Sequence, residues 1–226
     1  MNETILEARA LRKAFGHTEA LRGATLAVDE GEIVAVTGPS GSGKSTLLLC
    51  LAGILRPESG EVWHGGQRLD QLSETDRTLL RRREFGIVLQ FGQLVPELTG
   101  VQNVALPLLL DRHDRRDADT VAHGWLERVG AESMATALPG EMSGGEMQRV
   151  AVARALVTGP RVVFADEPTG SLDTVGGEQV LGALVKAVRE AGATLVMVTH
   201  DNRVAASADR EIVLRDGTVE SLPGSL

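Results

Sequence analysis

The stretch Gly38-Pro39-Ser40-Gly41-Ser42-Gly43-Lys44-Ser45-Thr46 decides the fold that we predict for this chain. It matches the pattern G-x-x-x-x-G-K-[ST] without a gap. An apolar run, Glu32–Gly38, precedes it, and a helical pattern, Lys44–Leu55, follows it. A chance glycine-rich turn would not require this strand–loop–helix context, whereas a phosphate-binding loop does. The sequence therefore predicts a nucleoside triphosphate site here, with Mg·ATP as the expected ligand.

The residue types of this loop suit phosphate chemistry. Gly41 and Gly43 allow backbone N–H groups to close on a phosphate without an intervening Cβ. A helix that begins at Lys44 directs its positive end at the anion, and the lysine adds a mobile charge. The Ser45 hydroxyl is a candidate Mg²⁺ ligand. Kinases, GTPases, motors and transport ATPases share this loop, so it does not separate them.

Composition narrows the class of protein. The 226 residues suffice for one domain with an appended lobe or for two small domains, and 42% hydrophobic residues indicate a globular chain. The net charge of −8 does not favour nonspecific nucleic-acid binding, which needs a basic surface. The single cysteine, Cys50, excludes an intrachain disulfide, and its apolar neighbours predict that it is buried.

Short apolar runs alternate with helical patterns along the chain. Runs that are rich in β-branched residues and apolar on both faces are typical of buried parallel strands. The predicted strands are 32–38, 85–90, 161–166 and 193–200, and the predicted helices are 44–55, 146–157 and 177–191. This alternation predicts an α/β fold with a parallel sheet.

Other segments depart from that alternation. Residues 3–36 and 60–66 contain turns and short segments in which apolar and polar residues alternate. This pattern predicts a small antiparallel sheet at one side. Residues 212–220 predict a hairpin on the Asp216-Gly217 turn. Between Gln90 and Met142 the chain lacks a strong strand pattern, and residues 111–129 predict a helical insert.

Polar residues follow several of the predicted strands. Asp166 and Glu167 end one strand, where acids face the ligand edge of an open α/β sheet. We expect Asp166 to hold Mg²⁺ and Glu167 to orient and deprotonate water. A strand that merely reaches solvent could also end in acids, but the phosphate loop favours the catalytic role. His200 and Gln90 end two further strands, where they could contact the γ-phosphate, the water or the metal.

A second candidate anion site precedes the helix at 146–157. Its residues are Ser143, Gly144, Gly145 and Glu146, in which the serine can cap the helix and the glycines leave the first N–H groups open. An ordinary capped helix would be the alternative. Two glycines are a costly helix start unless another group approaches the backbone closely.

Together these motifs resemble the ATP-binding cassette (ABC) family, in order and approximate spacing, over essentially the whole chain. The resemblance implies a P-loop NTPase core with a side antiparallel β-subdomain and a helical insert. It implies one domain over residues 1–226, with the core and antiparallel part in 1–90 and 158–226 and the helical subdomain at about 91–157.

The same resemblance implies a head-to-tail dimer that hydrolyses ATP. Phe15 would stack on adenine, and Glu167, His200, Gln90 and Lys44 would serve catalysis. The second subunit would contribute Ser143 to Glu146 and Asp173 to each nucleotide. Met142 stands where leucine is usual in the family, and we expect its side chain to pack rather than to bind phosphate. The dimer could contain two identical or two different ATPase subunits.

The segment Gln90–Leu110 is similar to that of ATPases from bacterial lipoprotein-release, macrolide-efflux and antimicrobial-peptide-resistance systems. The resemblance implies an integral membrane permease that contacts the chain near Phe91–Asn103. The first residues lack a signal-peptide pattern, and the longest apolar runs are far below the roughly 20 residues that span a bilayer. We therefore expect a separate permease, a peripheral location at the cytoplasmic face of the membrane, and no nucleic-acid partner.

Two alternatives remain at this point. A soluble ABC ATPase that acts on DNA or ribosomes usually carries two cassettes, coiled-coil arms or basic extensions, which this sequence lacks. A regulatory module without turnover is the other, and the presence of Glu167 and His200 argues against it. The transported substrate and the direction of transport are not readable from this chain.

Overall fold

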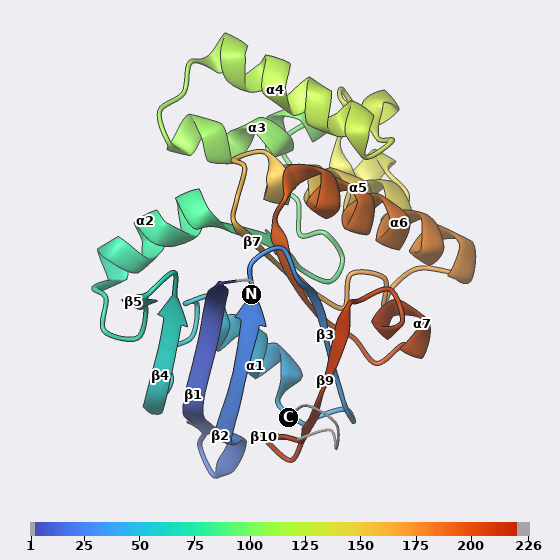
Figure 1. The fold of residues 1–226 in the computed structure, drawn as a ribbon. Coiled ribbons are helices and arrows are strands. Elements are labelled where there is room, and N and C mark those ends of the chain that lie inside the picture. Colours follow the sequence, from blue (N-terminus) through green and yellow to red (C-terminus); the bar gives the residue numbers. More distant parts are fainter. Residues whose placement is uncertain (1–2, 221–226) are drawn as a thin grey trace. The chain divides into compact units, whose positions relative to one another are not determined.

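The computed structural model describes residues 3–220, which form two compact units (Figure 1). The first unit contains Met1–Arg81 and Thr194–Leu226, and the second contains Arg82–Ala193. This division differs from the predicted helical subdomain at about 91–157, which stays a prediction. The ends of the predicted domain, residues 1–2 and 221–226, lie outside the described residues.

An antiparallel sheet forms one side of the first unit. Its strands are β1 (Thr4–Phe15), β2 (Thr18–Asp29), β4 (Ser59–His64) and β5 (Gln67–Arg68), in the order β2-β1-β4-β5. Leu6, Ala8 and Leu11 of β1 are fully buried, while Arg9 is exposed. Such alternation is expected of strands with one face in the core. The predicted antiparallel sheet is confirmed.

Parallel strands form the other sheet of the first unit. β3 (Ile33–Thr37) pairs in parallel with β8 (Thr194–Val198) and with β9 (Arg210–Arg215). Every residue of β3 and β8 is buried, as their apolar runs predict. β10 (Thr218–Val219) pairs antiparallel with β9 and completes the predicted hairpin. A short helix, α7 (Asn202–Ala205), follows β8.

Helix α1 (Lys44–Leu51) is shorter than the predicted span of 44–55, which was wrong at its C-terminal end. Gly53 adopts a left-handed conformation (φ 65°), and the Ile54 amide donates to the Leu49 carbonyl. This is the usual way in which a glycine terminates a helix, because it satisfies the last free carbonyls. Cys50 is buried within α1, and burial raises the pKa of its thiol to about 11.

The second unit is mainly helical. Strand β6 (Phe85–Val88) pairs in parallel with β7 (Val162–Asp166). The helices are α3 (Gly100–Leu110), α4 (Arg115–Arg128), α5 (Gly144–Leu156) and α6 (Thr174–Ala191), with single turns η1 (Glu132–Met134) and η2 (Pro139–Glu141). The helical insert and the α/β class are confirmed. None of the described helices is long and apolar enough to cross a membrane.

Helix α2 (Glu74–Glu84) was missed in the sequence. It carries only one buried residue, Arg77, so it lacks the apolar periodicity that would have indicated it. Its N-terminal signal was present, since the Ser73 hydroxyl accepts a hydrogen bond from the Asp76 amide.

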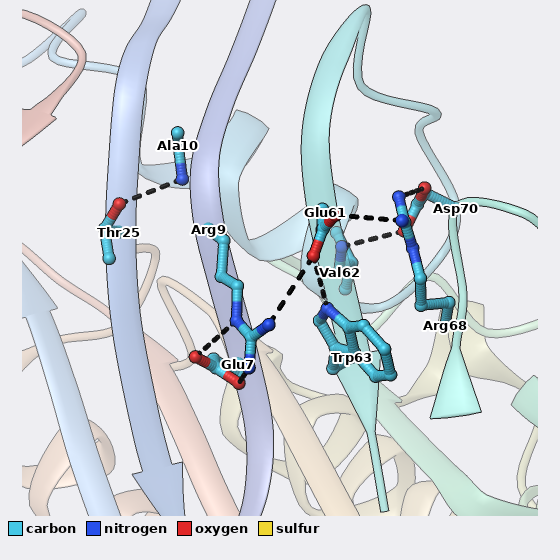
Figure 2. A network of polar contacts seen from close by, with 9 residues as sticks. All are labelled: Glu7, Arg9, Ala10, Thr25, Glu61, Val62, Trp63, Arg68 and Asp70. Carbon is cyan, nitrogen blue, oxygen red and sulfur yellow. Dashed lines mark hydrogen bonds and ion pairs between the residues drawn. The ribbon is translucent and has the colours of Figure 1, made fainter. Parts of the chain in front are cut away.

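A polar network covers the solvent face of β1, β4 and β5 (Figure 2). Arg9 and Arg68 lie on either side of Trp63, with guanidinium carbons 5.1 and 5.7 Å from the centroid of its ring. Glu61 accepts a hydrogen bond from the Trp63 indole at 2.9 Å and one from Arg68 at 2.9 Å. Asp70 accepts from Arg68 at 2.6 Å and from the Val62 amide at 3.0 Å.

We predict that Asp70→Asn lowers the free energy of unfolding by about 1–2 kcal/mol at pH 7, because charge-assisted bonds are lost. Burial disfavours the charged form of Asp70, but the bonds from Arg68 and Val62 outweigh it and lower the pKa of the carboxyl. A lowered folded-state pKa contributes stability above the unfolded-state pKa, and that contribution disappears as the pH falls. Urea unfolding at pH 7 and near pH 3 should therefore show the difference at neutral pH and little of it in acid.

Glu19→Gln is the matched control for this measurement. Glu19 lies in β2 of the same sheet, its side chain is about half exposed, and its closest cation is 3.6 Å away. Exposed ion pairs contribute little. Equal losses of unfolding free energy in Asp70→Asn and Glu19→Gln would contradict a specific role for the Asp70 contacts.

Candidate functional site

The phosphate loop connects β3 to α1 within the first unit and is built on close backbone contacts. Gly38, Gly41 and Gly43 have positive φ angles of 139°, 78° and 100°. A Cβ at Gly38 would lie 2.0 Å from the Leu214 carbonyl oxygen, and one at Gly43 would lie 2.2 Å from that of Ala20. No other residue type fits these two positions, so the loop's shape follows directly from its glycines.

The lysine of the loop is folded back onto the loop itself. Lys44 Nζ donates to the carbonyl oxygens of Gly38 and Pro39, both at 2.9 Å, and the residue is only 8% exposed. The Ser42 hydroxyl is buried, and within residues 3–220 it makes no hydrogen bond. A buried polar atom without a partner is costly, and a phosphate oxygen in the loop would satisfy it. Ser40, Ser45 and Thr46 lie in the same loop and the first turn of α1.

His200 belongs to the same edge of the first unit. In the β3–β8 pairing Val36 lies opposite Val198, and the Thr199 amide donates to the Val36 carbonyl. Gly38 and His200 therefore each follow a paired position by two residues at the carboxyl ends of neighbouring parallel strands. This edge is where open α/β sheets bind ligands.

Phe15, the predicted adenine contact, ends β1 and is 52% exposed. The Lys13 ammonium lies 5.6 Å from the centroid of its ring, and Gly16 follows with a φ angle of 60°. An exposed aromatic ring at a strand end is a surface on which a flat base can stack.

The second unit contains the other predicted catalytic residues. Val88 of β6 pairs with Ala165 of β7, so Gln90 and Glu167 each follow this paired position by two residues. Glu167 has a positive φ angle of 46°, a strained conformation that is typical of functional sites. A Cβ added at Gly170 would lie 3.3 Å from Glu167 Cβ and 3.4 Å from Gln90 Nε2. The structure thus brings Gln90 and Glu167 together beside Gly170.

Asp166, which ends β7, has an intermediate exposure. Its carboxylate, the Gln90 amide oxygen and the Ser45 hydroxyl are oxygen donors, and Mg²⁺ prefers such ligands. No group of three or more His, Cys, Asp or Glu side chains among the described residues could by itself hold a metal. The donor chemistry therefore fits an ion that also relies on phosphate and water.

The Ser143–Glu146 segment forms the capped start of α5. Glu146 Oε2 accepts from the Ser143 amide at 2.7 Å and from its hydroxyl at 2.8 Å. These bonds, first that from the backbone, lower the pKa of Glu146. The predicted serine cap is observed. In addition, the Glu146 carboxylate is hydrogen-bonded to Ser143. Met142 is 8% exposed, in line with its predicted packing role.

The segment around Asp173 lies against this helix start. Asp173 caps α6, with its carboxylate accepting from the Gly176 amide at 2.7 Å. A Cβ at Gly144 would lie 3.1 Å from Leu172 Cδ2. The structure therefore places Gly144 beside Leu172, the residue that precedes Asp173.

Three residues around Gln90 were missed in the sequence. Gly170 lies beside both Gln90 and Glu167, while Gln148 and Arg154 of α5 donate hydrogen bonds to carbonyls of the segment 89–93. No sequence motif indicates that a side chain will donate a hydrogen bond to a backbone carbonyl that is far away along the chain. The only available signal was that Arg154 stands within an otherwise apolar run, Val150–Leu156.

Comparison with known proteins agrees with this geometry. The family described as ABC transporter matches residues 21–170. The lipoprotein-releasing system ATP-binding protein LolD of Psychrobacter arcticus is 45% identical, and the alignment covers 96% of this chain and 98% of the relative. LolD of Porphyromonas gingivalis is 42% identical, with 96% and 99% covered.

A solved structure, the ATP-binding cassette MJ0796 in a dimeric post-hydrolysis state with ADP and Pi, is 37% identical, with a TM-score of 0.88. That alignment covers 96% of this chain and 97% of the other. The predicted family and ATPase activity are confirmed. This chain belongs to the ABC transporter family, and it is a nucleotide-binding subunit that hydrolyses ATP.

Proposed function

We propose that this chain powers a bacterial membrane permease on a separate chain, in a system of the lipoprotein-release, macrolide-efflux or peptide-resistance type. The observation that carries the proposal is the pairing of a complete phosphate loop with the capped glycine start of α5 on one chain. The names of the two LolD relatives support lipoprotein release within that group. The charge of −8 and these relatives do not favour a role on DNA or ribosomes.

Nucleotide binding begins with an exchange of partners at Lys44. The β- and γ-phosphates replace the carbonyls of Gly38 and Pro39 as acceptors of its ammonium, and the loop amides from Ser40 to Thr46 surround the β-phosphate. The Ser42 hydroxyl gains the partner that it lacks. Phe15 stacks on the adenine base.

Mg²⁺ would be held by Ser45, Gln90 and Asp166, whose oxygen atoms suit it, and it would neutralise charge on the β- and γ-phosphates. Glu167 orients a water molecule and accepts its proton as the oxygen attacks the γ-phosphorus. The bond from that phosphorus to the bridging oxygen breaks, and ADP and phosphate result. Gln90 and His200 position the water and the γ-phosphate, while Lys44 stabilises the developing charge.

A second ATPase subunit, identical or different, completes each site. Ser143, Gly144 and Gly145 of one subunit would contact the γ-phosphate held by the other, and Asp173 would lie across the interface. Glu146 would act through Ser143, because its carboxylate already accepts from the serine amide and hydroxyl. ATP then favours the closed pair by binding it more tightly than the open one, and hydrolysis reverses the preference.

The permease would contact the segment Phe91–Asn103 at the cytoplasmic face of the membrane. Phe91 is 62% exposed, and an aromatic side chain so exposed is a typical protein-interaction anchor. The C-terminal end of the segment is nevertheless held rigidly by the buried Asn103. Its side chain accepts a hydrogen bond from the Val95 amide and donates to the carbonyls of Val95, Leu98 and Thr99. A segment that is held rigidly in this way can transmit closure of the two ATPase subunits to the permease.

We predict that Glu167→Gln lowers kcat for ATP about a hundredfold or more, the usual effect of losing a general base. Binding residues are untouched, so ATP should trap a closed dimer that size-exclusion chromatography detects. Glu178→Gln, an exposed change on α6, is the control and should behave as the wild type. Unchanged turnover in Glu167→Gln would show that another group is the base.

Gly170→Ala tests the geometry around Gln90 and Glu167. The added Cβ would push on both side chains by a few tenths of an ångström, so we predict a kcat lower by about tenfold with a nearly unchanged KM. Gly182→Ala on α6 is the control, because its Cβ would meet no atom within 4 Å. If both variants retain wild-type kcat, the approach of Gln90 to Glu167 is not required for turnover.

Phe91→Asp tests the permease contact. We predict that it greatly reduces co-purification of the chain with a co-expressed permease of this type, because a charge replaces an exposed apolar anchor that the permease would cover. Ile54→Asp, at another partly exposed apolar residue in the first unit, should retain the complex. Retention of the complex by Phe91→Asp would place the contact elsewhere.

A further inference from the structure

The backbone that follows Gln90 is strained. Phe91, Gly92 and Gln93 have consecutive positive φ angles of 64°, 67° and 43°. The Gln93 amide donates to the Phe91 carbonyl at 2.7 Å, which closes a tight γ-turn, and the Gly92 amide donates to the Leu89 carbonyl at 3.1 Å. Non-glycine residues rarely adopt such angles unless the surroundings impose them. Some other part of the second unit must therefore hold this turn in place.

Helix α5 provides that support. Arg154 donates from Nη2 to the Gly92 carbonyl at 2.8 Å and from Nη1 to the Gln93 carbonyl at 3.0 Å. Gln148, which is only 2% exposed, donates from Nε2 to the Leu89 carbonyl at 3.2 Å. The turn also packs tightly on the helix backbone, since a Cβ at Gly92 would lie 3.1 Å from the Met147 carbonyl oxygen. Gln90 thus lies in a segment bonded to α5 on both sides.

The guanidinium of Arg154 is used in an unusual way. Within residues 3–220 it makes no ion pair, and burial lowers its pKa. Its two terminal nitrogens instead reach two successive carbonyls of the turn. Arginine stays charged in proteins and presents its donors in a fixed planar fork, whereas lysine offers a single nitrogen. The fork of arginine therefore suits this position, because each terminal nitrogen reaches a different carbonyl.

We propose that Arg154 is a positioning residue, which holds Gln90 at its catalytic position by clamping the carbonyls of Gly92 and Gln93. Because Ser143 caps the start of α5, the clamp also joins Gln90 to the helix whose start would contact the second nucleotide. A shift of that helix during closure would carry Gln90 with it. This proposal rests on the role proposed above for Gln90 in catalysis.

The experiment compares the wild type with Arg154→Lys, Gln90→Ala and the double variant in steady-state ATP hydrolysis. Lysine retains the charge, but its side chain is shorter and lacks the planar fork that presents a separate nitrogen to each carbonyl, so we expect kcat to fall about tenfold to a hundredfold while KM changes little. In the Gln90→Ala background, adding Arg154→Lys should lower kcat almost no further, because Arg154 acts through Gln90. Arg116→Met, on the exposed N-terminal turn of α4, is the control and should match the wild type.

Hydrogen–deuterium exchange provides the second measurement, and it needs no turnover. We expect faster exchange confined to residues 89–93 in Arg154→Lys, with an unchanged melting temperature. Equal kcat losses in the wild-type and Gln90→Ala backgrounds would overturn the proposal, and so would unchanged exchange in a folded Arg154→Lys variant. If Gln90→Ala alone retains wild-type kcat, the proposed role of Gln90 fails instead, and the exchange result still decides whether Arg154 clamps the turn.

Discussion

Close approach of backbone to backbone around the phosphate loop is the constraint on which the first unit depends. Gly38 and Gly43 lie against the carbonyls of Leu214 and Ala20, at distances that exclude any side chain. The Gly217 amide donates to the Ser42 carbonyl, and the Gly217 carbonyl accepts from the Arg22 amide. The loop is therefore locked to β2 and to the β9–β10 hairpin, so its shape exists before any nucleotide arrives. Such preorganisation spares ATP the entropy cost of ordering the loop.

Helix α5 has a comparable role in the second unit. Its first turn presents Ser143 in a reciprocal cap with Glu146, and its later turns hold the strained segment after Gln90 through Gln148 and Arg154. One rigid helix thus serves both the predicted contact with a second subunit and the predicted contact with the permease segment. Rigid elements transmit displacement because packed interiors do not deform continuously.

Backbone strain and an unsatisfied polar atom both occur within the candidate site. Glu167 and Phe91 adopt positive φ angles, and Ser42 is buried without a partner among the described residues. Each is costly in isolation, and functional sites are where such costs persist. By contrast, the network of Arg9, Trp63 and Arg68 on the antiparallel sheet satisfies its polar groups internally, which suits a stabilising surface.

Much of the fold and of the candidate site could be predicted from the sequence, because local patterns carry them. The phosphate loop, the buried strands and the serine-capped start of α5 each have a fixed spacing with a local physical cause. Helix α2 and the true end of α1 were not predicted, since one has no apolar face and the other depends on a glycine that overrides the helical pattern. Only the tertiary structure decided that Gly170 lies beside both Gln90 and Glu167, and that Arg154 clamps the carbonyls of Gly92 and Gln93. Arg154 lies 62 and 61 positions from Gly92 and Gln93 and meets them through backbone carbonyls, which every residue has, so no spacing of side-chain types can reveal the clamp.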